Sequence, residues 1–185
     1  QELLANISFS PNQSCVGSTV SFTGSAEVLP DPPYSDPNVT SWTWNFGDPN
    51  SGANNTASGQ SVSHSFTGPQ TFYQITLIAA GVCGTDTTTT FIDLNPQPLL
   101  TSTAAQVICE GQSATVSVTA VGGNPGYSYS WNGSGTISCV TCSSTTVSGL
   151  SPGTTYPYTV TVTDAFGCTS TATSLVTVNP RPVVS

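Results

Sequence analysis

The stretch Ser41-Trp42-Thr43-Trp44-Asn45-Phe46-Gly47-Asp48 decides the fold class of the first half of the chain. Trp42, Trp44 and Phe46 alternate with polar residues, and successive side chains of a β-strand point to opposite faces. The three aromatic side chains therefore share one face, which we expect to lie in a core. Gly47-Asp48 then ends the run with residues typical of a turn.

The second half of the chain repeats this alternation. Tyr127, Tyr129 and Trp131 share one parity, and clusters of Gly and Pro interrupt the strand-like runs at residues 122–126 and 151–153. No window keeps apolar residues at helical spacing without a Gly, Pro or β-branched interruption. The sequence predicts an all-β chain of two tandem immunoglobulin-like β-sandwich domains, because 185 residues are too many for one such sandwich and enough for two.

Charge is nearly absent from this chain. It has one Lys or Arg and nine Asp or Glu, a net charge of -8, together with 27 serines and 30 threonines. A nucleic-acid partner and an anionic membrane surface both need clustered bases, so we expect neither partner. The apolar runs are far shorter than the ~20 residues of a membrane span, so we expect no membrane insertion. The apolar fraction of 36% still allows a core.

An internal repeat divides the chain. Asn95-Pro96-Gln97-Pro98 recurs 84 residues later as Asn179-Pro180-Arg181-Pro182, and each copy follows a strand-like run. Proline cannot join a sheet ladder and keeps the chain extended, so we expect short, stiff linkers. We predict domains at 1–95 and 101–178, a linker at 96–100, and the start of a next linker at 179–185. The parent protein is expected to continue beyond Ser185.

The six cysteines indicate an oxidising, extracellular location. In each half a Tyr-x-β-branched strand begins ten residues before a cysteine, Cys83 or Cys168. This equal spacing predicts that Cys15 pairs with Cys83 and that Cys109 pairs with Cys168. Cys139 and Cys142 are expected to close a small structural loop. A redox pair would favour a helix N-terminus, and a zinc site would need a second thiol pair at suitable spacing.

Several motifs of the first half resemble the PKD (polycystic kidney disease) domain. They are Trp44-Asn45-Phe46-Gly47-Asp48, then His64-Ser65-Phe66, then the strand from Tyr73 to Leu77. The resemblance covers about residues 10–95, and it implies that Trp44, Phe46, Asp48, His64 and Tyr73 form a core signature. It carries no catalytic residues.

Residues 123–131 and 158–168, with Trp131 and Tyr158, resemble a repeat of gliding-motility adhesins of Bacteroidota. The small loop at Cys139 and Cys142 is also similar to loops in those proteins. This resemblance implies export by the type IX system and display on the bacterial outer surface. By the same resemblance to that phylum, Asp86-Thr87-Thr88 looks like an O-glycosylation signal, and Thr87 is the candidate for a glycan.

Candidate sites for chemistry are few. His64 is the one imidazole, and catalysis by it would need a nucleophile and an orienting acid. Asp31, Asp36 and Asp48 would hold calcium if the Pro-rich loop of residues 28–38 folds over the strand end. The alternative is that Asp48 bonds its own turn and the others are solvated. Tyr34, Phe72 and Tyr156 are the candidates for exposed aromatic side chains.

The leading hypothesis is a structural and adhesive segment of a long secreted surface fibre, acting as a disulfide-stabilised spacer or binding module and not as an enzyme. Expected partners are neighbouring domains of the same protein and surface glycans or surface proteins. One alternative is a carbohydrate-binding or spacer region of a secreted hydrolase. Another is a self-assembling filament subunit, with the extended residues 2–7 on an exposed sheet edge.

Overall fold

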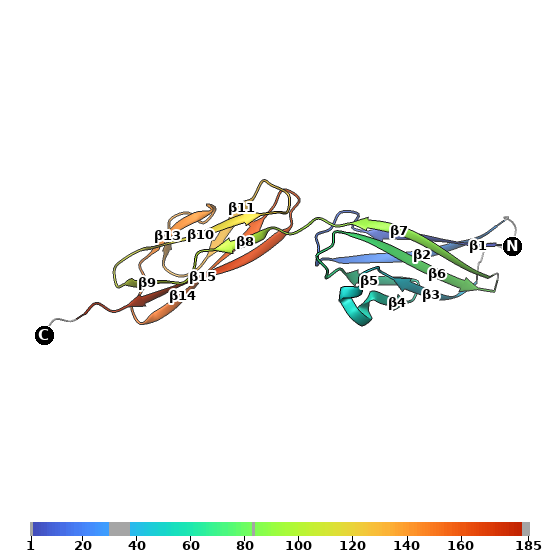
Figure 1. The fold of residues 1–185 in the computed structure, drawn as a ribbon, viewed down its shortest axis with the longest axis horizontal. Helices are drawn as coiled ribbons and strands as arrows, with labels where there is room; N and C mark the ends of the chain where they lie inside the picture. Colours follow the sequence, from blue (N-terminus) through green and yellow to red (C-terminus); the bar gives the residue numbers. More distant parts are fainter. Residues whose placement is uncertain (1, 30–37, 83, 183–185) are drawn as a thin grey trace. The chain divides into compact units, whose positions relative to one another are not determined.

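The computed structural model describes residues 2–29, 38–82 and 84–182. The chain separates into two compact units, Gln1–Asn95 and Pro96–Ser185, which we call unit 1 and unit 2 (Figure 1). Each unit consists of two β-sheets packed face to face over its own core. The prediction of an all-β chain with two tandem immunoglobulin-like sandwiches is confirmed.

Unit 1 contains one sheet with the strand order β1-β2-β5 and a second with the order β4-β3-β6-β7. All pairings in both sheets are antiparallel. The strands are β1 (Glu2–Ser10), β2 (Thr19–Leu29), β3 (Val39–Asn45), β4 (Thr56–Ser58), β5 (Ser61–Ser65), β6 (Phe72–Gly81) and β7 (Gly84–Asp93). A short 3-10 helix, η1 (Pro49–Asn55), joins β3 to β4.

The core of unit 1 follows from the alternation of its strands. Along β6, Tyr73, Ile75 and Leu77 point inward while their neighbours face outward. Trp44 and Phe46 are fully buried as predicted, whereas Trp42 is half-buried at the core margin. The buried cluster consists of Val20, Phe22, Trp44, Phe46, Phe66, Tyr73, Ile75, Leu77, Ile92 and Leu94.

Unit 2 contains one sheet with the order β12-β13-β10-β8 and a second with the order β11-β14-β15-β9. The pairing of β9 with β15 is parallel, and the others are antiparallel. The strands are β8 (Leu99–Ser102), β9 (Gln106–Cys109), β10 (Ala114–Val121), β11 (Ser128–Asn132), β12 (Thr136–Ile137), β13 (Ser144–Ser148), β14 (Thr154–Thr163) and β15 (Thr169–Asn179).

The core of unit 2 is built around Trp131, Tyr158 and the valines of β10, β14 and β15. Tyr127 and Tyr129 pack against it from the same face as Trp131, as the alternation predicts. The ring of Tyr158 packs against the backbone of Gly133, the residue that follows β11. A Cβ atom at Gly133 would lie 2.3 Å from this ring. Only glycine fits there.

One boundary differs from the expected organisation. Leu99 and Leu100, which the sequence places in the linker, belong to β8 and pair with Val121 and Ala120. Their inclusion follows from their apolar side chains, since Leu100 packs against the core of unit 2. Within the described ranges, no helix is long and apolar enough to cross a membrane.

Candidate functional site

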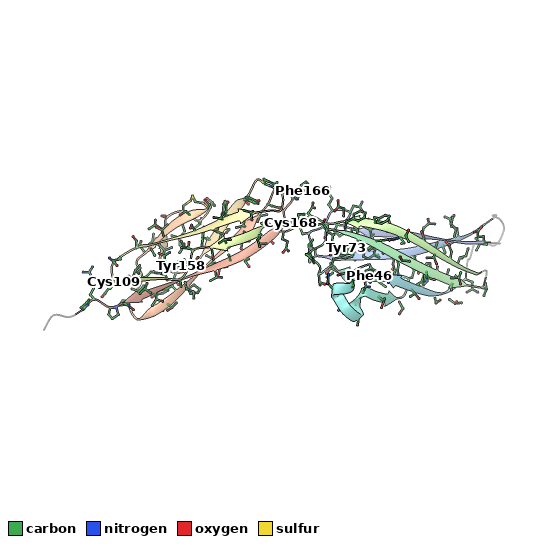
Figure 2. All side chains as sticks on the ribbon, in the orientation of Figure 1. Phe46, Tyr73, Cys109, Tyr158, Phe166 and Cys168 are labelled. Atoms are coloured by element: carbon green, nitrogen blue, oxygen red, sulfur yellow. A yellow bond between two sulfur atoms is a disulfide. The ribbon has the colours of Figure 1, made fainter. Side chains whose placement is uncertain are left out.

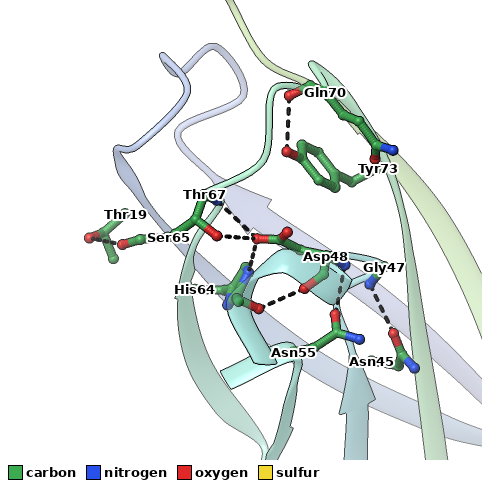
Figure 3. A network of polar contacts seen from close by, with 11 residues as sticks. Thr19, Asn45, Gly47, Asp48, Asn55, His64, Ser65, Thr67, Gln70 and Tyr73 are labelled. Carbon is green, nitrogen blue, oxygen red and sulfur yellow. Dashed lines mark hydrogen bonds and ion pairs between the residues drawn. The ribbon is translucent and has the colours of Figure 1, made fainter. Parts of the chain in front are cut away.

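A buried pair of ionisable side chains joins the two sheets of unit 1. His64, on β5, places its Nε2 atom 3.2 Å from Oδ2 of Asp48, which follows β3 (Figure 3). Oδ2 also accepts a hydrogen bond from the backbone N–H of Thr67 at 2.9 Å. Asp48 is completely buried and His64 is 4% exposed. The pair therefore connects the turn after β3 with β5 and the loop that follows it.

The expectation that Asp48 bonds its own turn is wrong for its side chain. The turn is held instead by other groups, since the Asp48 N–H donates to Asn55 Oδ1 and the Ser51 hydroxyl donates to the Asp48 carbonyl. This leaves the carboxylate free to reach across to β5. The imidazole of His64 stacks on Phe46, with ring centroids 4.3 Å apart, and meets Phe66 edge-on.

Tyr73 closes the same region from β6. Its hydroxyl donates to the carbonyl of Gln70 at 2.9 Å. Burial raises the pKa of Tyr73, and the nearby charge of Asp48 raises it further. The motif residues of unit 1 thus form one continuous network of core and polar contacts.

A cleft of about 620 Å³ opens beside this network, between η1–β4 on one side and β5 on the other. Phe46, Ala57 and His64 contribute to its lining, and the rest is polar and uncharged. The polar lining residues are Asn50, Ser51, Asn54, Thr56, Ser63, Ser65 and Thr67. Its volume is in the range of ligand sites in proteins.

The Asp48–His64 pair has two of the parts of a nucleophilic triad, an acid and an imidazole. In the described part of the chain, however, no hydroxyl or thiol forms a hydrogen bond with His64, whose Nε2 is engaged by Asp48. Stacking on Phe46 further fixes the ring in the core. The arrangement therefore serves the fold, and the sequence had not predicted the pairing of these two residues.

The predicted calcium site is only partly described. Asp31 and Asp36 lie outside the described residues. Oδ2 of Asp48 is occupied by His64 and Thr67. Among the residues that the structure describes, no group of three His, Cys, Asp or Glu side chains gathers in a way that fits a metal ion.

The predicted Cys109–Cys168 disulfide is wrong. Cys109 is a free, exposed thiol. It pairs with Asn179 in the parallel register of β9 and β15, eleven positions along the chain from Cys168. At about 3.3 Å per residue this places the two cysteines roughly 36 Å apart, far beyond the Cα separation of a disulfide. Figure 2 shows Cys109 and Cys168 at opposite ends of unit 2.

The small disulfide between Cys139 and Cys142 is present and confirms that prediction. The loop it closes supports Trp131, whose indole Nε1 donates to the Cys142 carbonyl at 2.8 Å. The backbone N–H of Trp131 also donates to the Val140 carbonyl. For the predicted Cys15–Cys83 pair, Cys83 lies outside the described residues.

The turn between β14 and β15 is organised by Asp164. Its carboxylate accepts hydrogen bonds from the backbone N–H groups of Asn124, Phe166 and Cys168, at 2.9–3.0 Å. Burial opposes its ionisation, but these bonds outweigh that effect, and the pKa of Asp164 lies below its ordinary value. Sequence reasoning missed this residue, although an Asp followed by a Gly-bearing turn is a typical signal.

Tyr158 donates its hydroxyl to the Ser134 carbonyl at 2.7 Å, which anchors the core signature of unit 2. Burial, and then the neighbouring Tyr156, raise the pKa of Tyr158. Of the predicted exposed aromatics, Phe72 is 57% exposed and stacks on Phe91. Tyr156 is half-buried against the core, because its hydroxyl is held by the Ser151 carbonyl. Tyr34 lies outside the described residues.

Thr87, the glycan candidate, lies on β7 with an exposed side chain. The preceding Asp86 turns its carboxylate to the backbone, accepting from Thr87 N–H and from Ala5 N–H on β1. β1 is an edge strand, as residues 2–7 were expected to be, and it is fully paired with β2 on its other side.

Comparison with protein families finds one relationship for unit 1. Residues 5–94 match the family model described as the PKD domain. This match supports the resemblance drawn from the motifs of the first half. The likeness of unit 2 to a gliding-motility repeat stays a prediction. No curated protein matches the chain.

Solved structures with a similar fold include three N-terminal domains of the outer capsid protein Hoc of bacteriophage RB49, at 11% identity and a TM-score of 0.42. The eight N-terminal Ig domains of Down Syndrome Cell Adhesion Molecule have 16% identity and a TM-score of 0.40. The fibronectin(III)-like modules of Clostridium thermocellum CbhA have 12% identity and a TM-score of 0.39. Each match covers 96% of this chain, which spans 59%, 25% and 95% of those chains respectively.

Proposed function

We propose that this chain, whose residues 5–94 match the PKD domain, is a structural and adhesive segment of a long secreted fibre on a bacterial cell surface. Immunoglobulin-like and PKD domains with disulfides fit an extracellular module that contacts neighbouring domains and other proteins. In the finer form of the proposal, the parent is a gliding-type adhesin of Bacteroidota exported by the type IX system.

The observation that carries the proposal is where the chain enters and leaves each unit. In unit 1 it enters at Glu2, at one end of the nine-residue strand β1, and leaves at Asn95, which bonds to Ser14 beyond the other end of β1. The length of β1 separates the two points by about 30 Å.

Unit 2 has the same design. Its entry at Pro98 lies beside Gly123, near Asp164 and the start of β15, and its exit at Asn179 bonds to Glu110 at the other end of that strand (Figure 1). A unit entered at one end and left at the other can be linked to further units in series. It also carries tension along its strands, which is what a fibre segment needs.

Single-molecule force spectroscopy of the 185-residue chain tests this role. With the disulfides reduced, we expect two separate unfolding events, each releasing about 300 Å of chain, because each unit of about 90 residues has its own core. A chain that extends without force peaks would overturn the spacer role. Antibody labelling of intact cells tests the surface location, and a catalytic domain in the same reading frame would favour a spacer of a secreted hydrolase.

A further inference from the structure

The cleft of unit 1 is bordered by an unpaired strand edge. β5 pairs with β2 on one side and has no strand partner on the other within the described residues. The Gly24 N–H donates to the Gln60 carbonyl, which makes these two residues a hydrogen-bonded pair at the start of β5. Such pairs alternate with non-bonded pairs along an antiparallel ladder. The backbone groups of Ser61, Ser63 and Ser65 therefore point away from β2.

Side-chain contacts agree with this alternation. Side chains of non-bonded pairs stand closer together, and the hydroxyls of Thr19 and Ser65 are 2.8 Å apart. Ser63 and Ser65 both line the cleft, and in the described part of the chain no backbone hydrogen bond is made on their open side. The wall of the cleft formed by β5 thus presents free N–H and C=O groups in an extended row.

The opposite wall is equally unpartnered. The Phe46 N–H donates to the Asn55 carbonyl, so by the same alternation the backbone of Thr56, the first residue of β4, points away from β3. Asn50 and Asn54 line this side, and their carboxamides make no hydrogen bond to the rest of the described chain. Each carboxamide offers both a donor and an acceptor to a peptide backbone.

Unit 2 shows what covers the equivalent edge there. β13 pairs with the central strand β10 as β5 pairs with β2, but its second edge is covered by β12. Thr136 and Ile137 of β12 lie opposite Ser148 and Val147, and the Ser138 N–H adds a bond to Thr146. In unit 1 the chain at this point forms η1 and β4, which joins the other sheet. One unit therefore covers with its own strand the edge that the other leaves open.

We propose that the cleft of unit 1 binds an extended, uncharged peptide segment of a partner chain, which adds to β5 as a strand. A five-residue edge of about 17 Å accommodates about five residues of such a segment. The lining carries no ionisable side chain apart from His64, which faces Asp48, so small polar and β-branched side chains like those of β12 are preferred. A saccharide is disfavoured, because the rings of Phe46 and His64 are 1% and 4% exposed and offer no face for stacking.

This inference names the partner of the adhesive function proposed above and rests on it. The test uses the ¹⁵N-labelled 185-residue chain and a synthetic peptide with the sequence of residues 132–138, Asn-Gly-Ser-Gly-Thr-Ile-Ser. We expect saturable shifts of the Ser63 and Ser65 amides and of the Asn50 and Asn54 side-chain amides, with slower hydrogen exchange at Ser63 and Ser65.

Two controls separate strand addition from general contact. The first control needs no change to the protein and uses two versions of the peptide, N-methylated on one or the other set of alternate residues. The version whose methyl groups block the amides that face β5 should bind at least tenfold more weakly than the other version. Ser63→Pro removes an open-side donor without touching the ladder to β2 and should weaken binding similarly.

Absence of shifts at the cleft at millimolar peptide would overturn the inference, as would equal binding of both methylated peptides. A neutral oligosaccharide that shifts the same amides when the peptide does not would also overturn it. Force spectroscopy without peptide tests the spacer role independently of peptide binding. Failure of the proposed function can therefore be distinguished from failure of this inference.

Discussion

His64 Nε2 lies 3.2 Å from Asp48 Oδ2, and this buried contact joins the turn after β3 in one sheet of unit 1 to β5 in the other. The second carboxylate oxygen, Oδ1, is buried and makes no hydrogen bond among the described residues. A buried carboxylate is costly unless it is paired, so the donors on Oδ2 compensate for its burial. Removing either partner would leave the other unpaired in the core.

We therefore expect Asp48→Ala to destabilise unit 1 by about 3–5 kcal/mol, the usual cost of breaking a buried pair. Asp93→Ala is the matched control, because Asp93 is exposed at the end of β7 and should change stability by less than about 0.5 kcal/mol. Hydrogen exchange of the amides in β2 and β6 under denaturant reports on unit 1 alone. Similar effects of the two variants would contradict the structural role of Asp48.

The stability of unit 2 should depend on pH through Asp164. Its folded pKa is lowered, so its contribution is fully present above the unfolded value of about 3.9 and is lost as the pH falls through the folded value. Asp164→Asn should lower the urea midpoint of unit 2 at pH 7. At strongly acidic pH the midpoints of the variant and the unchanged protein should become similar. Glu110→Gln, at an exposed carboxylate, is the matched control for replacing one acid by its amide. An unchanged acid dependence in Asp164→Asn would contradict this assignment.

The fold was predictable because its signals are local. Alternation in the stretch from Trp42 to Phe46 and in the one from Tyr127 to Trp131 sets which face is buried, and burial drives the packing of the sheets. The PKD motif residues were recognised for the same reason. Their individual contacts were not, because the bond between Asp48 and His64 depends on how the turn after β3 meets β5, across sixteen residues of sequence.

The predicted pairing of Cys109 with Cys168 failed for a related reason. The ten-residue spacing from Tyr158 to Cys168 describes only the hairpin at the end of the unit. It does not indicate where Cys109, early in the unit, lies in the fold. β9 pairs with β15 in parallel, which carries Cys109 to the far end of the unit from Cys168. A parallel register between the first and last parts of a domain leaves no local pattern in the sequence. The cleft of unit 1 likewise leaves no local pattern. β4 of unit 1 and β12 of unit 2 follow equivalent strands along the chain, but β4 joins the sheet of β3 whereas β12 joins the sheet of β13.

The free thiol of Cys109 should react with a maleimide in the folded protein, because it is exposed. Peptide mapping after digestion with chymotrypsin identifies the labelled residue. Cys109→Ser should abolish this label and leave the stability of unit 2 unchanged. A Cys109 that becomes reactive only after reduction would contradict the structure and restore the predicted pairing.

The loop closed by Cys139 and Cys142 should stabilise unit 2 by its hold on Trp131. Closing so short a loop is worth roughly 2 kcal/mol in the loop-entropy model, so the double variant Cys139→Ala/Cys142→Ala should lose about that amount. Because the Trp131 indole and backbone both bond to the loop, its fluorescence should also shift as the ring gains access to water. Cys109→Ser serves as the control for removing a cysteine without opening a loop. A double variant that keeps both its stability and its Trp131 emission would show that the loop holds its shape without the disulfide, and that packing of Val147 and Tyr158 around Trp131 is sufficient.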